Sequence, residues 1–382
     1  MAEAFILDCV RTPMGKNGGQ FAEVRGDQLL AECLKALEKR NKLDPAQVED
    51  VVGGCVTQTG EQGVNIIRQA VLVAGWPQEV PGVSVNRLCG SSQQATYFAA
   101  LEVMGGQADL TVGCGQESMS RTPMGSDVGA FNQNMLERYE IISQGLSAEL
   151  VAERYKVTRE EIDQFSFESH RKAVHAMKEG RFKNEIVPVP VYDKTGKLVK
   201  TIDTDEGPRA DANLDKMKTL KPVFKPDGVI SAGASSQITD GAAAVLIGSK
   251  EKAKQLGLRP RARFVAHAQV GVDPTIMLTG PIPATKKVLD KAKMKLSDID
   301  LFEINEAFSS VVLAWQKELG VDPRTVNVNG GAVALGHPLG ATGARLITTI
   351  VNELERQKLR FGLVTMCIGF GQGTATIIER LT

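Results

Sequence analysis

The feature that most limits the possible folds of this chain is an order of predicted helices and strands that occurs twice. Near the start, a predicted helix over 27–42 precedes a predicted strand over 48–52. Near the end, a predicted helix over about 284–293 precedes a predicted strand over 300–304. Each half then continues with a helix, a short strand, a glycine-containing turn, a helix and a further strand. Alternating strands and helices indicate a mostly parallel α/β sheet in each half, with functional groups at the strand ends.

Similar four-residue segments end the short predicted strand of each half. Val83-Ser84-Val85-Asn86 ends the short strand of the first half, and Val326-Asn327-Val328-Asn329 ends that of the second. A turn with Cys89 follows the first segment, and a turn with His337 follows the second. A duplicated unit with a pseudo-two-fold axis would bring these turns together. Two unrelated α/β halves of similar order are the alternative.

The turn of the second half has few bulky side chains. Its glycines are Gly330, Gly331, Gly336, Gly340 and Gly343. Glycine permits close backbone approach or a positive φ. We therefore expect the imidazole of His337 to lie in a tight pocket lined by backbone. Another glycine turn, which carries Cys367, follows the predicted strand over 361–366.

Two cysteines and one histidine, each on an exposed turn, suggest covalent catalysis by a thiol. Cys89 precedes a predicted helix over 91–104, so we expect the helix dipole to lower its thiol pKa. Cys367 suits a thiol acid and base tuned near neutrality. Asn305 follows a strand and is expected to hold a water or donate to an oxyanion. Taken singly, each residue has a structural interpretation: a core cysteine, a structural histidine or a strand-end turn.

The remaining cysteines and the charge balance exclude several classes of function. Cys9, Cys33, Cys55 and Cys114 are expected in the core, and without CxxC spacing neither a metal site nor a disulfide framework is predicted. This cysteine usage favours a reducing cytoplasm. Lys and Arg number 45, as do Asp and Glu, so nucleic acid is not an expected partner. No leader or membrane-spanning run is expected.

A segment of different composition, residues 118–240, separates the halves and is called the lid here. Thr158 and Glu161 form a predicted capping box that opens a helix running to about Lys178. A predicted hairpin has strands over 185–193 and 198–203. The lid also carries a basic cluster, which is either a solvated surface or an anion-binding patch. Its members are Arg209, Lys216, Lys218 and Lys221.

At these residues the chain resembles the thiolase family of 3-ketoacyl-CoA thiolases and acetyl-CoA acetyltransferases. The resemblance spans essentially the whole chain. It rests on Arg11–Gly15, Asn86–Ser92, Ser235–Ala242, Asn305–Phe308, the His337 turn and the Cys367 turn. It implies two duplicated five-strand α/β halves in an αβαβα layered fold with an inserted lid. The implied domains are 1–117 with 241–262, 118–240, and 263–382.

The resemblance also implies a role for each matching residue. Cys89 is implied as the acylated nucleophile, His337 as its activator and Cys367 as the acid and base at the α-carbon. His337 with a water held by Asn305 resembles one oxyanion hole, and the N–H groups of Cys89 and Gly369 resemble the other. Further positions match contacts of coenzyme A (CoA), which is a substrate, so no cofactor is implied. These are Arg209 near the adenine, Ser236 at the pantetheine, and Phe224, Met277 and Phe308 along an apolar tunnel.

The implied reaction is thiolysis of a 3-oxoacyl-CoA by CoA in fatty-acid or steroid side-chain β-oxidation. Members tuned to acetoacetyl-CoA carry a His-Met-Gly word where this chain has Ser143-Gln144-Gly145, which favours longer or bulkier acyl groups. The stretch between Met119 and Ser143 is short for a tetramerisation hairpin, so a homodimer is expected. The alternatives are a biosynthetic acetoacetyl-CoA thiolase, a ketoacyl synthase-like condensing enzyme and a non-catalytic lipid-binding relative.

Overall fold

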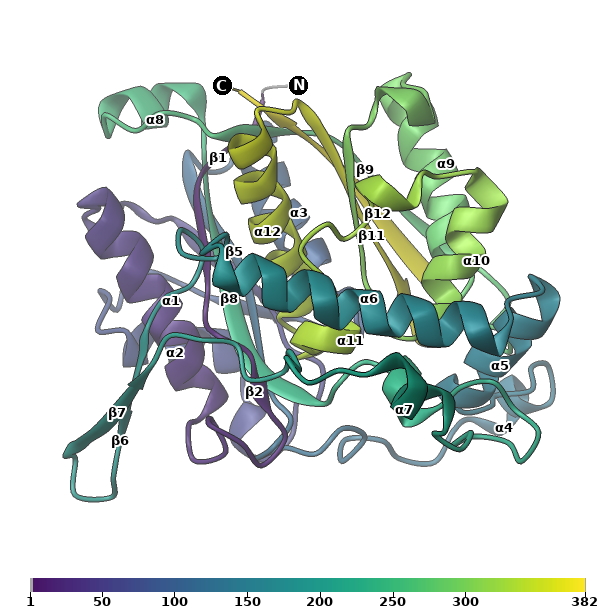
Figure 1. Ribbon diagram of the computed structural model, residues 1–382. Helices are drawn as coiled ribbons and strands as arrows, with labels where there is room; N and C mark the ends of the chain where they lie inside the picture. The colour runs from purple at the N-terminus through teal and green to yellow at the C-terminus, as the bar shows by residue number, and fades with distance from the viewer. Residues whose placement is uncertain (1–2, 382) are drawn as a thin grey trace.

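The two halves of the chain build one path of hydrogen-bonded strands, described for residues 3–381 of a computed structural model (Figure 1). The first half contributes, in spatial order, β4 (Val83–Val85), β3 (Asp50–Gly54), β5 (Leu110–Ser118), β8 (Thr239–Gly248) and β1 (Phe5–Arg11). The second half contributes β10 (Leu301–Ile304), β11 (Phe361–Ile368), β12 (Gln372–Arg380) and β9 (Ala262–Gly271). Strand β3 is parallel to β4 and β5, and β10 is parallel to β11. Strand β8 is antiparallel to β5 and β1, and β12 is antiparallel to β11 and β9, so the sheet is mixed and the prediction of a mostly parallel sheet is wrong. Strands β1 and β9 join the halves, and the short β2 (Gly15–Lys16) pairs with β8.

The predicted duplication is confirmed by this strand order. Strands β1, β3, β5 and β8 occupy the same places in their half as β9, β10, β11 and β12 do in theirs. The strand predicted at 326–329 is wrong, because only Val326 forms a bridge, to Phe302. Asn327 turns the chain with a φ of 44°, and its side chain bonds the backbone N–H and C=O of Ile304. The strand predicted over 48–52 lies two residues later, because Val48 still closes a 3-10 turn.

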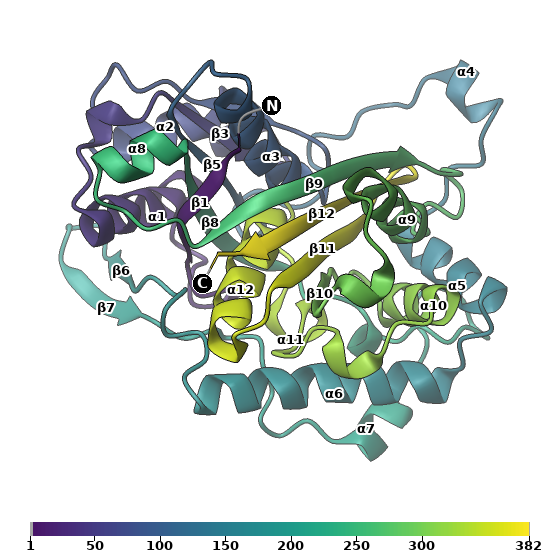
Figure 2. The ribbon, with the colours of Figure 1, turned by 90° about the horizontal axis from the view of Figure 1, so that it is seen from above.

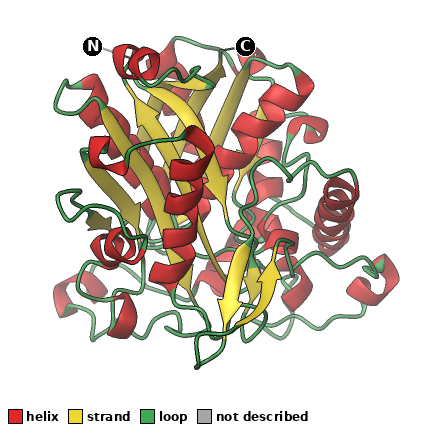
Figure 3. Cartoon of the chain, turned by 90° about the vertical axis from the view of Figure 1, so that its left-hand side faces the viewer, coloured by secondary structure: helices red, strands yellow, loops and turns green. Residues whose placement is uncertain are grey.

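The helices form three layers around the two half-sheets (Figures 2 and 3). Helices α1 (Gly26–Asn41) and α2 (Ile66–Val73) cover the outer face of the first half, with α8 (Lys250–Gln255) at its edge. Helices α3 (Ser91–Met104) and α12 (Thr342–Gln357) lie between the half-sheets, and α9 (Pro281–Ala292) and α10 (Ser309–Leu319) cover the second outer face. Strand β8 shows the alternation this requires: Leu246 packs outward and Val245 inward. This is the expected αβαβα arrangement.

The lid lies between the end of β5 and the start of β8. It contains α4 (Gln133–Leu136), α5 (Gln144–Arg154), α6 (Arg159–Lys178), the hairpin β6 (Val189–Tyr192) and β7 (Leu198–Ile202), and α7 (Leu214–Lys218). The capping box at Thr158 and Glu161 and the hairpin are confirmed. The exact domain boundaries stay a prediction. Within residues 3–381, no helix has both the length and the apolar character needed to cross a membrane.

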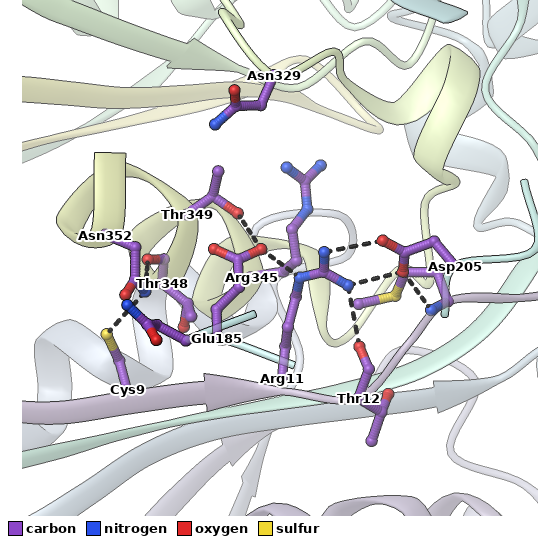
Figure 4. Close-up of polar contacts among 12 residues, drawn as sticks. Cys9, Arg11, Thr12, Glu185, Asp205, Asn329, Arg345, Thr348, Thr349 and Asn352 are labelled. Carbon is purple, nitrogen blue, oxygen red and sulfur yellow. Dashed lines mark hydrogen bonds and ion pairs between the residues drawn. The ribbon is translucent and has the colours of Figure 1, made fainter. Parts of the chain in front are cut away.

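Arg11 fastens the lid to the first half (Figure 4). It lies at the end of β1 and is fully buried. Its guanidinium donates to Glu185 at 2.6 Å and to both carboxylate oxygens of Asp205 at 2.7 and 2.9 Å. Glu185 also accepts from Thr349 on α12. Removing Arg11 would leave Glu185 and Asp205 buried without a counterion, so we expect its loss to weaken the attachment of the lid to the first half.

Candidate active site

The site lies where the N-termini of the central helices α3 and α12 meet. The Ala344 N–H donates to Ser92 Oγ at 3.0 Å, which joins the first turns of the two helices. A Cβ at Gly343 would overlap the backbone nitrogen of Gln93, and one at Gly115 would overlap the carbonyl oxygen of Gly340. The glycines of the His337 turn therefore serve close backbone approach, as predicted. Gly336 serves backbone conformation too, with a φ of 98°.

Cys89 sits on a strained turn immediately before α3. Leu88 has a φ of 46°, and Ser91 Oγ closes the turn by donating to the Leu88 carbonyl at 2.6 Å. Cys89 is buried, with 5% of its surface exposed. Its own N–H, the N–H of Gly369 and the side chain of Gln144 lie close to the sulfur and oppose, as donors, part of the effect of burial on the thiol pKa. The turn thus aims the sulfur at the glycine turn of the other half.

The predicted low pKa of Cys89 is wrong. Burial raises the pKa of the thiol above its ordinary value, although the nearby donors of Gly369, Cys89 and Gln144 partly offset this. Burial dominates because the thiolate loses its hydration, and the helix N-terminus does not replace it fully. Cys89 is therefore a thiol at rest, and a base would have to take its proton before the sulfur could act as a nucleophile.

Cys367 and Asn305 lie at the carboxyl ends of the neighbouring parallel strands β11 and β10. The Asn305 N–H donates to the Thr365 carbonyl at 3.0 Å, which places Asn305 beside the last residues of β11. Burial, and then the nearby Cys89, raise the pKa of the Cys367 thiol far above its ordinary value. The prediction of a thiol tuned near neutrality is therefore wrong for this state. A Cβ at Gly90 would overlap the side chain of Ile368, so the Cys89 turn directly contacts the end of β11. Cys367 lies within that strand, paired with Gly373, and not on the glycine turn after it as predicted.

His337 is held by one hydrogen bond at each ring nitrogen. Nδ1 lies 2.6 Å from Thr342 Oγ1, and that hydroxyl donates its proton to the Pro338 carbonyl at 2.8 Å. The hydroxyl therefore accepts from Nδ1–H, which leaves a lone pair on Nε2. The Asn305 side-chain amide lies 3.2 Å from Nε2 and matches that lone pair as a donor. Nε2 of His337 is thus unprotonated and accepts a hydrogen bond from Asn305.

Burial lowers the pKa of His337 to about 3, and the positive charge of Arg345 adds to the effect. Arg345 lies one turn after Thr342 on α12 and is buried, as is its partner Glu303 at 3.5 Å. Glu303 occupies the same face of β10 as Asn305, two residues earlier. Burial raises the pKa of Glu303 to about 8, so the positive charge of Arg345 is the one that favours a neutral imidazole at His337.

A buried carboxylate holds the His337 turn against the first half. Glu117, at the end of β5, accepts from the Gly340 N–H at 2.8 Å and from the Val56 N–H at 2.9 Å. Its other oxygen accepts from the Thr57 N–H at 3.1 Å and from the Gln62 side chain at 2.7 Å. Four donors satisfy this carboxylate. It therefore holds the turn that carries His337 close to the first half, which carries Cys89.

The residues expected to contact CoA fall in two places. Phe308 and Met277 are buried in one apolar cluster with Cys367, and Phe224 packs against Phe308 with ring centroids 5.9 Å apart. Ser236 borders this cluster, since its N–H donates to the Ala307 carbonyl at 3.0 Å. Arg209 is not part of the cluster: it lies exposed on the lid, where its N–H donates to His170. An exposed basic residue beyond an apolar cluster suits a ligand with an apolar arm and an anionic head.

Three residues near the site were not predicted to be functional. Thr342 fixes the tautomer of His337, Arg345 opposes its protonation, and Gln144 lies close to the Cys89 sulfur as a donor. The sequence carries a signal for Thr342, which opens the helix after the glycine turn. The sequence marks Gln144 only through the Ser143-Gln144-Gly145 segment, as a position that bears on acyl size. Its contact with the Cys89 turn could not be predicted, because the two segments are remote in sequence.

The whole chain is similar to known proteins. Residues 4–251 match the family described as thiolase, N-terminal domain, and residues 258–380 match thiolase, C-terminal domain. The chain is 47% identical to the steroid 3-ketoacyl-CoA thiolase FadA6 of Mycobacterium tuberculosis, covering 100% of this chain and 95% of that protein. It is also 47% identical to a 3-ketoacyl-CoA thiolase of Photorhabdus laumondii, covering 100% of both. The chain therefore belongs to the thiolase family.

A solved structure gives the same fold. The acetyl-CoA acetyltransferase of Bacillus anthracis is 39% identical and superposes with a TM-score of 0.93. The match covers 100% of this chain and 99% of that one. The fold predicted from the duplicated halves is thereby confirmed.

Proposed function

We propose that this thiolase is an acyltransferase that cleaves a 3-oxoacyl-CoA with CoA, giving a shortened acyl-CoA and acetyl-CoA. The observation that carries the proposal is the meeting of the Cys89 turn and the end of β11, which carries Cys367, with a neutral His337–Asn305 pair at the N-termini of α3 and α12. Such a site holds a nucleophile, a base and a second acid in one buried place. The 3-ketoacyl-CoA thiolases among the relatives carry names that agree with this reaction.

Acylation begins with the thiol of Cys89. Its proton passes to Nε2 of His337, and the thiolate attacks the 3-keto carbon. The N–H groups of Cys89 and Gly369, which lie close to the sulfur at rest, are placed to donate to the oxygen that becomes negative. The bond between C2 and C3 then breaks, and its electron pair stays on C2 as the enolate of acetyl-CoA. Cys367 gives its proton to C2, and acetyl-CoA leaves.

His337 changes role during this step. Before proton transfer Nε2 carries a lone pair, and afterwards it carries an N–H that can donate to the enolate oxygen of the thioester. Asn305 Oδ1 has no hydrogen-bond partner among residues 3–381, so it is available to hold a water beside that oxygen. One imidazole thereby serves as base and then as oxyanion donor.

Deacylation reverses the proton movements. The thiol of the incoming CoA gives its proton to the Cys367 thiolate. The CoA sulfur then forms a bond to the acyl carbon, the bond from that carbon to Cys89 breaks, and Cys89 takes back the proton held by His337. We place pantetheine along Phe224, Met277 and Phe308 beside Ser236, and the adenine end near Arg209.

We further propose a homodimer in a reducing cytoplasm. Strand β4 is an open sheet edge, and Val83 on it is 43% exposed. Phe98 and Leu101 on the adjoining α3 are exposed as well, and such an edge is normally covered. All six cysteines are unpaired and buried, which suits a reducing compartment. Light scattering should give the mass of a dimer. The mass of a tetramer would contradict the argument that the 119–143 stretch is too short to form a tetramerisation hairpin.

The test of the reaction uses CoA and a series of 3-oxoacyl-CoA thioesters of increasing length, with a steroid side-chain thioester included. Mass spectrometry should detect an acyl-CoA shortened by two carbons. If only acetoacetyl-CoA reacts, the enzyme has the acetyl-CoA acetyltransferase specificity named for the Bacillus anthracis structure. Release of carbon dioxide from malonyl-CoA would indicate a condensing synthase. No turnover of any thioester would indicate a lipid-binding relative.

A further inference from the structure

The lid places an amide side chain directly over the Cys89 turn and the turn that follows Cys367. Helix α5 begins at Gln144, with Ser143 as its N-cap. The nitrogen Nε2 of Gln144 lies 3.0 Å from the position that a Cβ on Gly369 would take. Leu88, the neighbour of Cys89, lies 3.1 Å from the same position. Gln144 therefore lies over the point where the Cys89 turn meets the turn that follows Cys367, with its amide nitrogen close to the Cys89 sulfur and able to donate to it.

The start of α5 is held firmly in this place. Ser147 Oγ donates to the Thr275 carbonyl at 2.7 Å, and Ser310 Oγ donates to the Ala148 carbonyl at 3.0 Å. A Cβ at Gly145 would overlap the ring of Phe224, so the helix lies directly on the apolar cluster. Glu149 accepts from the N–H groups of Val229 and Ile230 at 2.8 and 2.9 Å. The amide of Gln144 is therefore presented by a rigid element.

The chemistry of the amide suits a sulfur that gains and loses negative charge. An amide N–H donates to a thiolate without carrying a charge, so it adds no repulsion toward the imidazolium that forms at His337. Hydrogen bonds to charged groups are about twice as strong as those between neutral groups. A hydrogen bond from Gln144 to this sulfur therefore strengthens when Cys89 loses its proton.

We propose that Gln144 is a further catalytic residue, whose side-chain amide stabilises the Cys89 sulfur as a thiolate. The inference rests on the proposed function for its effect on turnover. Gln144 acts when the thiolate attacks the 3-keto carbon, and again when the bond between Cys89 and the acyl carbon breaks and the electron pair returns to sulfur. The Ser143-Gln144-Gly145 word, where other thiolases carry His-Met-Gly, thus contributes to chemistry as well as to acyl fit.

The experiment measures the rate of iodoacetamide alkylation of Cys89 against pH, with peptide mapping to identify the labelled cysteine. Gln144→Met keeps the length of the side chain and removes the donor. We expect alkylation below the thiol pKa to slow roughly 10-fold to 100-fold, since a hydrogen bond to a charged group is lost. Gln144→Glu should slow it further while the carboxylate is ionised and recover part of the loss at low pH, where a protonated carboxyl donates. Gln133→Met, on the exposed α4 of the same lid, is the matched control and should react as wild type.

Turnover separates this inference from the proposed function. We expect Gln144→Met to lower kcat by a factor similar to the loss in alkylation, with a smaller change in KM. Alkylation of Gln144→Met within twofold of wild type, in a folded protein, would overturn the inference even if thiolysis is confirmed. If wild type is alkylated faster than Gln144→Met but cleaves no 3-oxoacyl-CoA, the role of Gln144 at the Cys89 sulfur is supported and the proposed function is contradicted. If Gln144→Met does not fold, the pH dependence of Gln144→Glu decides alone.

Discussion

At the scale of single residues, the site works through neutral groups at rest. The pKa values of the Cys89 and Cys367 thiols are raised and that of His337 is lowered, so burial keeps each of these proposed catalytic groups uncharged. Charge therefore forms only when a proton moves from Cys89 to His337. Because these three groups are neutral at rest, no desolvated ion pair forms among them until a proton moves.

His337 should carry two contributions, so its loss should be severe. His337→Ala removes the base, worth about 10²–10⁴-fold, and one oxyanion donor, worth about 10²–10³-fold. We expect kcat/KM for thiolysis to fall at least 10³-fold on these ranges. His175→Ala, an exposed histidine on α6, is the control and should be unaffected. Activity of His337→Ala within tenfold of wild type would mean that His337 is structural.

The two cysteines should differ in reactivity and in role. The Cys89 sulfur has three donors close to it, whereas Cys367 has only its own N–H to offset burial. Limiting iodoacetamide should therefore label Cys89 first. Cys367→Ala should still form an acyl-enzyme from a saturated acyl-CoA, because no C2 proton moves in that step, and should fail in carbon–carbon cleavage. Peptide mapping that finds Cys367 labelled first would reverse the assignment.

At the scale of elements, close contact between α3 and α12 aligns the nucleophile with the base. Gly343→Ala places a methyl group on the backbone of Gln93 and should separate the first turns of these helices. Overpacking of this kind costs about 1–3 kcal/mol, so we expect a lower Tm and a lower kcat together. Gly129→Ala, which has open space around it, is the control. An unchanged Tm for Gly343→Ala would show that the helices can shift without loss.

Local signals predicted most elements, and their failures have local causes. The capping box at Thr158 and the turn before α3 were predictable, because both depend on neighbouring residues. The strand at 326–329 was not, since Asn327 bonds the backbone of Ile304 rather than continuing the pattern. The raised pKa of Cys89 and the contact of Gln144 depend on burial and on packing between remote segments. Neither the burial of Cys89 nor its contact with Gln144 can be predicted from the sequence of a single turn.

At the scale of the whole molecule, buried neutral histidines make the stability depend on pH. His267 bonds Thr376 at 2.8 Å and stacks on Tyr97, and burial lowers its pKa to about 3. Its pKa in the unfolded chain is the ordinary value of 6.5. Between these values the unfolded chain binds the extra proton, so the contribution is complete above pH 6.5 and is lost as the pH falls toward 3.

Replacing His267 should remove this pH dependence. For wild type, His267 contributes a slope of up to about 1.4 kcal/mol per pH unit to the free energy of unfolding in that window. The advantage of wild type over His267→Gln should therefore shrink as the pH falls from 6.5 to 4. Urea unfolding at fixed protein concentration measures both curves. Parallel curves across this range would show that His267 is not the group that takes up the proton.

The meeting of two half-sheets at one site has a consequence for how such an enzyme can evolve. Cys89 belongs to one half, and His337 and Cys367 belong to the other, so the proposed reaction needs groups from both halves. The glycine contacts between α3 and α12 tolerate almost no added atom, whereas Met124, Val128 and Phe131 on the lid are exposed. Mutations can therefore accumulate in the lid and change the acyl preference, while the contact between α3 and α12 stays fixed. New substrate preferences would arise from changes in the lid, and the reaction would be retained because the contact between α3 and α12 changes little.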